Sequence, residues 1–561
     1  MTTTQEAAAA PAAPGAHHRV HRETMTRREV LEALSGILLG MFVAILAESV
    51  LSTSLPRIIT DLGGSQSSFT WVVTATLLTT TITTPIWGKL SDLVDRKLLI
   101  QLALTITVIS SALAGFSQNT GELIGWRAVQ GIGAGGLTAL ATVLMADIIS
   151  PRERGRYMGL LGGIMGLDMV GGPLLGGVIT DSLSWRWNFF IGLPFAIGAI
   201  VVLQRTLHLP KAKKQRVSID YMGALTLSAG VALLLLWVTF ANSSFAWLSW
   251  QTFVMVGASV LLLAATVWIE NHVAEPIIPM RLFRNRTFVL AVLASVSVGV
   301  GLFGSQVFLS QYMQLARGRT PTESGLLTIP MIVGVFLSST ISGRIISRTG
   351  RYKAFMIAGG VVMTAGLGLM GTIDYHTSFV LVGLWMFVLG AGVGMLMQNL
   401  VLAVQNTLDV REIGAGTAAV AFFRTLGGAI GVSVLGAVLS HRVQDLMLKG
   451  LAGIGINPAA LGGSTSSLPD LATLPGPVRD VVERAFGDGV AELFLIGMPL
   501  ALLALITVFF LKEVPLGKRS GIEQRLELED EADEIVSSAV DQALVELEAG
   551  EHDEEGVATA R

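Results

Sequence analysis

Long apolar blocks, separated by short polar stretches, run along most of this 561-residue chain. A bilayer core about 30 Å thick is crossed by ~20 apolar residues in helical form, and block after block reaches that length. Runs such as 221–241 and 491–511 show no alternation of polar and apolar positions, which excludes the strands of a membrane barrel. The pattern therefore predicts an all-α integral membrane protein.

Fourteen such blocks are present, and each is predicted to cross the membrane. Their expected bounds are 33–55, 70–90, 98–116, 123–145, 156–179, 187–204, 221–241, 251–270, 287–308, 323–343, 354–372, 378–400, 413–438 and 491–511. An even number of spans places both chain ends on one side of the membrane. Residues 439–490 are predicted to be a long outer loop that ends in a short helix at 476–487.

The basic residues of the short loops indicate the orientation. If the N-terminus is cytoplasmic, the short inner loops hold 19 Lys and Arg, whereas the short outer loops hold four. Positive charge concentrates on the cytoplasmic side of inner-membrane proteins. We therefore expect an inner or plasma membrane protein with both termini in the cytoplasm.

Composition removes several other classes of protein. Hydrophobic residues make up 52% of the chain, charged residues 14%, and the mean hydropathy is +0.64. A soluble protein of this length needs a more charged surface. The absence of cysteine excludes disulfides and thiolate metal sites, and no metal site is predicted. The acidic stretch 522–548 either docks on the basic inner loops or stays solvated.

The loop between the second and third predicted spans carries a recognisable pattern. It contains Gly88, Asp92 and Arg96 in the run GKLSDLVDRK, and resembles the signature loop of the major facilitator superfamily. In that family the glycine permits a tight turn, and the aspartate caps the next helix or pairs with the arginine. Asp95 stands where relatives carry a second glycine. A weaker echo at 343–351 fits an internal repeat of the two halves.

Arg127 lies inside the fourth predicted span. An arginine in a membrane helix is costly unless it is paired or hydrated, so it is functional by default. The stretch LIGWRAVQGIGAG around it resembles the proton-linked motif of the same superfamily. Its glycines formally match a dinucleotide fingerprint, but no strand precedes them, and we expect them to permit close helix packing.

The fifth predicted span is rich in glycine and contains Gly172, Pro173 and Gly176. It resembles the antiporter motif of the superfamily, which is found in exporters. Together with further stretches at 185–190, 311–325 and 424–431, the chain is similar to the fourteen-span drug:proton antiporter family.

That resemblance implies a domain organisation. We expect a major facilitator fold of two six-helix halves plus two extra central helices. The expected parts are a cytoplasmic tail (1–32), a first half (33–204), the extra helices (205–286), a second half that includes the long outer loop (287–511) and an acidic cytoplasmic tail (512–561).

Proton coupling needs a carboxyl group that can change its charge state within the bundle. Glu48 and Asp168 lie well inside apolar spans, and burial favours the neutral form of such groups. Relatives commonly carry Asp at the position of Ala47, and Asp168 replaces a glycine of the antiporter motif. With Arg127, these two acids are our candidates for proton coupling, whereas a purely structural ion pair is the alternative.

Candidate residues for substrate contact lie in the second half. Arg424 is near the inner end of its span, where it either lines the path or reaches out to water. The other candidates are uncharged amides and one aromatic ring: Gln306, Gln311, Gln398, Asn399 and Phe303. Such residues more often pack against neighbours or face lipid.

The resemblance implies a function. We expect a proton-coupled exporter of lipophilic or cationic amphipathic compounds, driven by the proton motive force without a cofactor. It is expected to be a monomer in lipid, with no nucleic-acid partner, and not an enzyme. A narrow exporter of one metabolite, antibiotic or lipid is the first alternative. A membrane sensor or scaffold that no longer transports is the second.

Overall fold

The computed structural model describes residues 27–63, 66–149, 171–206, 220–241, 245–273, 275–319, 321–409, 412–455 and 475–517, apart from single positions such as Pro173 and Gly177, and a few residues between 531 and 542. Over these ranges the regular secondary structure is helical, with one isolated bridge between Ala241 and Phe245. The predicted all-α class is confirmed.

The first half of the described chain contains six named helices. They are α1 (Arg27–Asp61), α2 (Gln66–Leu93), α3 (Arg96–Gly115), α4 (Thr120–Ile148), the short α6 (Trp187–Phe190) and α7 (Gly192–Thr206). Most of the fifth predicted span falls at 151–170, outside the described residues. The described remainder, between 171 and 182, is largely helical.

The extra pair and the second half follow. The pair is α8 (Tyr221–Phe240) and α9 (Trp250–Glu270). The second half is α10 (Arg286–Gln311), a π-helical turn (Tyr312–Ala316), α11 (Pro321–Leu327), α12 (Ile329–Thr349), α13 (Lys353–Met370), α14 (Phe379–Gln405), α15 (Ile413–Gly453) and α16 (Gly476–Phe510). Asp220, Ser249 and Asn285 cap α8, α9 and α10 through their side chains, which satisfies free backbone N–H groups.

Eleven helices in the described part of the chain are long and apolar enough to cross a membrane. The count of fourteen stays a prediction. Many apolar side chains point outward: Leu261 of α9 is 73% exposed and Val380 of α14 is 83% exposed. A water-soluble protein would bury such residues, whereas lipid accepts them.

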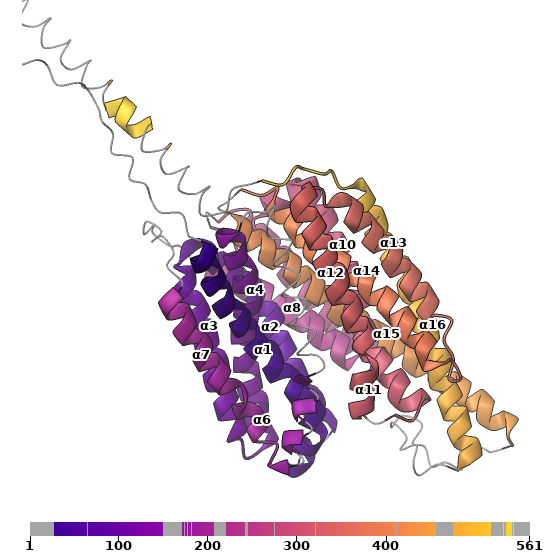
Figure 1. Cartoon of the computed structure of the whole chain (residues 1–561). Coiled ribbons are helices and arrows are strands. Elements are labelled where there is room, and N and C mark those ends of the chain that lie inside the picture. Colours follow the sequence, from indigo (N-terminus) through magenta and orange to yellow (C-terminus); the bar gives the residue numbers. More distant parts are fainter. Residues whose placement is uncertain are drawn as a thin grey trace, which may run out of the picture.

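The two halves meet along α2 and α15. A stripe of Leu78, Ile82 and Ile86 on α2 packs against the core of the second half. We call the end of the bundle where α1 begins and α16 finishes the terminal end, and the opposite end the distal end. In Figure 1 the halves lie close together at the terminal end and farther apart at the distal end, where α6 and α11 are labelled.

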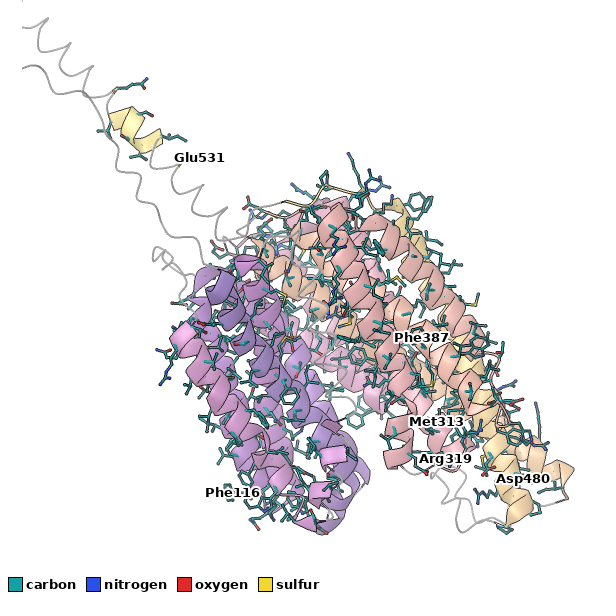
Figure 2. All side chains as sticks on the ribbon, in the orientation of Figure 1. Phe116, Met313, Arg319, Phe387, Asp480 and Glu531 are labelled. Atoms are coloured by element: carbon teal, nitrogen blue, oxygen red, sulfur yellow. The ribbon has the colours of Figure 1, made fainter. Side chains whose placement is uncertain are left out.

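The predicted outer loop is shorter than expected. Helix α15 continues to Gly453, and α16 begins at Gly476, so both flanks of the stretch 439–490 are helical and the predicted short helix is the start of α16. Leu439, Val443 and Val482 are buried between the two extensions. The extensions project beyond the neighbouring helices in Figure 1, and Figure 2 labels Asp480 on them, at the same end of the molecule as Phe116 of the first half.

Close helix contacts in the second half depend on glycines of α14. A Cβ atom on Gly390 would meet the backbone of Met331 in α12, and one on Gly392 would meet the backbone of Met363 in α13. Backbones that touch leave no room for a side chain, which is the small-residue packing typical of membrane helices. Helix α14 can therefore contact both neighbours at once.

We predict that Gly392→Ala destabilises the purified protein by about 1–3 kcal/mol, because the added methyl group forces α13 and α14 apart. The matched control is Gly257→Ala on α9, where nothing lies within 4 Å of an added Cβ. Thermal unfolding in detergent should show a lower midpoint for the first variant and no decrease for the second. Equal midpoints would contradict the packing role of Gly392.

Candidate functional site

Three buried charged side chains converge at the terminal end. Arg96 of α3 is 4% exposed, and its Nη2 donates to Oδ1 of Asp92 at 3.2 Å. Its Nη1 forms an ion pair with Asp147 of α4, and its Nε donates to the Ser91 carbonyl at 2.7 Å. Removing one partner from a buried ion pair typically costs 3–5 kcal/mol, so the three groups hold the ends of α2, α3 and α4 together.

Asp92 also crosses between the halves. Its carboxylate accepts the backbone N–H of Gly414 at 3.2 Å and that of Ala415 at 3.0 Å, in the first turn of α15. The first N–H groups of a helix have no partner within the helix, and its N-terminus carries partial positive charge. We call Asp92, Arg96, Asp147 and the first turn of α15 the latch.

One expectation about the signature loop needs correction, and one alternative for its aspartate is decided. Gly88 lies inside α2 and not in a turn, and a Cβ there would meet the Ala418 side chain on α15. Asp95, and not Asp92, caps α3, because its side chain accepts the Lys97 N–H at 2.8 Å. The predicted Asp92–Arg96 pair is present. Glycine at 88 is thus needed for contact between the halves, and Asp92 is available to bridge them.

Sequence reasoning missed two partners of this region. Asp147 lies just beyond the predicted end of its span at 145, where an acid looks solvated, yet α4 continues to Ile148 and buries it. Lys89 of α2 donates to Glu275 at 2.5 Å, which ties the signature to the segment after α9. An acid within the last turn of a span could have indicated Asp147, whereas no sequence signal connects positions 89 and 275.

Arg127 sits in a densely packed contact between α2 and α4. It is 4% exposed, and its Nη1 donates to Oε1 of Gln130 at 2.6 Å. The Thr76 hydroxyl donates to the Arg127 carbonyl at 3.2 Å, and the Thr80 hydroxyl donates to the Gly131 carbonyl at 3.1 Å. A Cβ on Gly131 would meet Thr76. The glycines therefore permit close packing, as expected. That packing fixes the position of Arg127 relative to α2.

The predicted carboxyl partners cannot be placed against Arg127. Glu48 belongs to α1, but its side chain lies outside the described part, as do Asp168 and Pro173 altogether. Gly172 is buried, and a Cβ on Gly176 would meet the Val50 carbonyl of α1. The fifth predicted span thus touches α1 two residues beyond Glu48.

A polar cluster near this contact was not predicted. Asn188 Nδ2 donates to the hydroxyls of Ser54 and Thr180, both at 2.7 Å, and these two hydroxyls lie 2.6 Å apart. All three side chains are buried. They join α1, the segment 178–180 and α6 within the first half, and they lie toward the distal end from Glu48.

The second-half candidates do not form one cluster. The ring of Phe303 on α10 packs against Gly428 of α15. A Cβ atom on Gly428 would collide with this ring. Gln306 is exposed and Gln311 is half-buried. Gln398 and Asn399 of α14 are buried, and Asn399 Nδ2 donates to the Met395 carbonyl of its own helix at 2.7 Å. The described contacts bring Phe303 close to the α15 stretch that holds Arg424, and they leave the amides apart.

Arg424 lies about three turns into α15. From Ile413 to Arg424, α15 rises ~16 Å, which is about half of a bilayer core. Its backbone carbonyl packs against Gly299 of α10, where an added Cβ atom would collide with the carbonyl oxygen. As a whole residue Arg424 is half-buried, and it has no ion pair with any described residue.

Comparison with known proteins decides the family. A family model described as Major Facilitator Superfamily matches residues 37–432. This chain belongs to the major facilitator superfamily. The match covers most of the first half, the extra pair and the second half as far as the middle of α15.

Individual superfamily members agree with this assignment. The multidrug transporter protein MdtP of Bacillus subtilis is 32% identical over 517 residues, which cover 88% of this chain and 95% of MdtP. The efflux pump FUS6 of Gibberella moniliformis is 30% identical, covering 86% of this chain and 87% of the pump. The solved proton:xylose symporter XylE is 15% identical, with a TM-score of 0.57 over 90% of this chain and all of XylE, so it supports the fold alone.

Membership settles the broad class. The chain is a multi-pass membrane transporter of the major facilitator superfamily and not an enzyme. The expected major facilitator fold is confirmed. The sensor or scaffold alternative loses its support, because the superfamily handles small molecules by transport.

We predict that Asp92→Asn loosens the latch of this superfamily member. Charged hydrogen bonds contribute ~1.5–3 kcal/mol each, so opening of the terminal end should increase roughly ten-fold or more. Ser91→Cys supplies a probe, since Ser91 is buried beside α15 and the chain has no other cysteine. Maleimide labelling of that cysteine should accelerate in the Asp92→Asn background.

Asp95→Asn is the matched control for this experiment. Asp95 caps α3, and its described hydrogen bond does not reach α15. Asparagine caps helices as well as aspartate does, so labelling at position 91 should keep its original rate. Equal acceleration in both variants would mean that Asp92 acts locally and does not hold the halves together.

Proposed function

We propose that the chain is a proton-coupled antiporter that exports lipophilic or cationic amphipathic compounds by alternating access. Similarity to a multidrug transporter over nearly its whole length is the observation that carries this proposal. An efflux pump among the relatives favours export over import. The proton motive force is then the energy source, and no cofactor is required.

The arrangement of the halves supports alternating access. The latch and the Gly88–Ala418 contact join α2 to α15 at the terminal end, whereas Figure 1 draws the halves apart at the distal end. Such a shape fits an outward-facing state of a transporter whose halves rock about a central site. Breaking the latch would let the terminal end open in turn.

Arg127, Glu48 and Asp168 are the proposed proton-coupling groups. Arg127 is buried toward the distal end, with Gln130 as a hydrogen-bond partner, and Gly176 brings the fifth predicted span against α1 near Glu48. A buried carboxyl exchanges its proton when access to water changes, because its charged form is costly when desolvated. An outer proton would neutralise the acid and favour release of a cationic substrate.

Substrate is proposed to contact the α10–α15 region. Phe303 offers an aromatic face, and Arg424 offers a half-buried charge at mid-depth. Gln306, Gln311, Gln398 and Asn399 are retained as further proposed lining residues. The cavity would then have acids on the first-half side and a cation with amides on the second-half side. We also propose a functional monomer in the cell membrane.

We predict that Glu48→Gln or Asp168→Asn abolishes substrate-driven proton movement. The purified protein in liposomes with a pH-sensitive dye inside, an imposed proton gradient and a panel of lipophilic cations gives the measurement. Substrate should release protons down the gradient in the parent protein, because export and proton entry share one cycle. Glu122→Gln is the control, since Glu122 is exposed in the cap of α4.

Other outcomes of the liposome experiment separate the alternatives. Movement retained in both acid variants would rule out Glu48 and Asp168 as coupling groups. No proton movement with any cation, by correctly inserted protein, would contradict the broad multidrug function. Mutual competition among chemically unlike compounds supports a broad exporter, whereas binding of one compound alone supports a narrow one.

The proposed orientation is tested separately. With both termini in the cytoplasm, a cysteine at Lys449 on the projecting end of α15 should react with an impermeant maleimide added to intact cells. A cysteine at Arg348, near the terminal end of α12, should stay unlabelled until the cells are opened. The reverse pattern would overturn the orientation.

A further inference from the structure

The segment between α9 and α10 is fixed to the second half at the terminal end. We call residues 275–285 the strap. Its Ile277, Ile278 and Leu282 are at most 5% exposed and belong to the apolar core of the second half. The Asn285 side chain donates to a backbone carbonyl just beyond the end of α14 at 3.3 Å. Closely packed side chains transmit displacement, so the strap moves with this half.

The first residue of the strap reaches across to the first half. Lys89 Nζ donates to Oε2 of Glu275 at 2.5 Å, and the two side chains form an ion pair. Lys89 belongs to α2 and precedes Asp92 of the latch by one helical turn. Its side chain is 13% exposed and that of Glu275 is 39% exposed, so the pair is partly shielded from water. A segment that is held in the second half thus contacts the signature region of the first.

The extra helices lie along the same seam between the halves. Helix α8 packs against both α2 and α15. Near the distal end, the rings of Trp71 on α2 and Phe240 on α8 lie 4.9 Å apart. Helix α2 is therefore joined to the extra pair and its strap near both of its ends, by aromatic rings at one end and by the Lys89–Glu275 ion pair at the other.

We propose that Glu275 is a positioning residue for the opening of the terminal end, because it holds Lys89, and with it the end of α2, against the second half until their ion pair breaks. This inference rests on the proposed alternating access. The latch and the strap then act in parallel, one from the first turn of α15 and the other from the segment after α9. The two extra helices thereby acquire a role in the transport cycle, since they carry the strap.

The ion pair must break because its two partners belong to bodies that separate. Opening at the terminal end moves the end of α2, and Lys89 with it, away from α15. Glu275 cannot follow far, since Ile277 is buried in the second half and two residues of extended chain span at most ~7 Å. The contact between Trp71 and Phe240 lies near the opposite end of α2, where this movement is smaller, and it can persist.

Maleimide labelling of Ser91→Cys tests the strap in the full chain, in lipid nanodiscs without substrate or gradient. Glu275→Gln and Lys89→Gln should each accelerate labelling about two- to five-fold, the range expected when a partly exposed ion pair is removed. The charge swap, Lys89→Glu with Glu275→Lys, should restore the parent rate. High salt should accelerate labelling of the parent more than that of Glu275→Gln, because salt screens such a pair.

Glu492→Gln is the matched control. Glu492 of α16 accepts a hydrogen bond from Arg442 Nε of α15 at 2.6 Å, and the two side chains are 43% and 41% exposed. This ion pair resembles the Lys89–Glu275 pair in length and exposure, but both of its partners belong to the second half. Its loss should therefore leave the labelling rate of Ser91→Cys unchanged.

Two outcomes would overturn the proposal. One is a parent labelling rate in Glu275→Gln, and the other is a charge swap that labels as fast as the single variants. If the double variant does not fold, the difference in salt dependence between the parent and Glu275→Gln decides the question. Because no transport is measured, the result is independent of proton coupling: rescue by the charge swap would support the strap even if the liposome experiment contradicted the antiport.

Discussion

The bond between the Asp92 carboxylate and the first turn of α15 is the contact on which the arrangement of the two halves depends. It joins a buried anion to the N-terminus of a helix from the other half. The anion is held in place by Arg96, and Arg96 is held by Asp147. Within the described residues, a network in the first half thus ends in two hydrogen bonds to the second. Such a contact is strong when formed but few bonds must break for it to open, which suits a transporter.

Glycine and threonine act together in setting helix distances. On α4 the glycines at 131, 133 and 135 face backbone and hydroxyl groups of α2 and α3. On α2 the threonines donate back to carbonyls of α4. In lipid no water competes for these groups, so close contact and hydrogen bonding replace the hydrophobic effect as the source of packing energy. The α2–α4 contact, together with the hydrogen bond from Arg127 to Gln130, positions the Arg127 side chain.

Several of the described ion pairs lie where motion is expected. The latch and the Lys89–Glu275 pair lie at the terminal end, on or beside α2. Other charged groups lie elsewhere: Arg127 is buried toward the distal end, and Arg424 lies about three turns into α15. The extra helices thus belong to the same electrostatic region as the signature loop. Their contact with α2 gives them a route to influence how the halves separate.

The sequence by itself determined the helical membrane class, the family and most helix positions. A helix that crosses lipid needs a continuous apolar segment, and each such segment can be recognised from neighbouring residues alone. It also identified Gly88, Asp92, Arg96 and Arg127 as unusual, since charge and glycine stand out against an apolar background. The tertiary structure decided what these residues do. Gly88 meets Ala418, Asp92 reaches Gly414, and Asp147 and Glu275 become partners of basic residues far away in the chain. Contacts between residues of different helices leave no local pattern, because they depend on how whole helices pack.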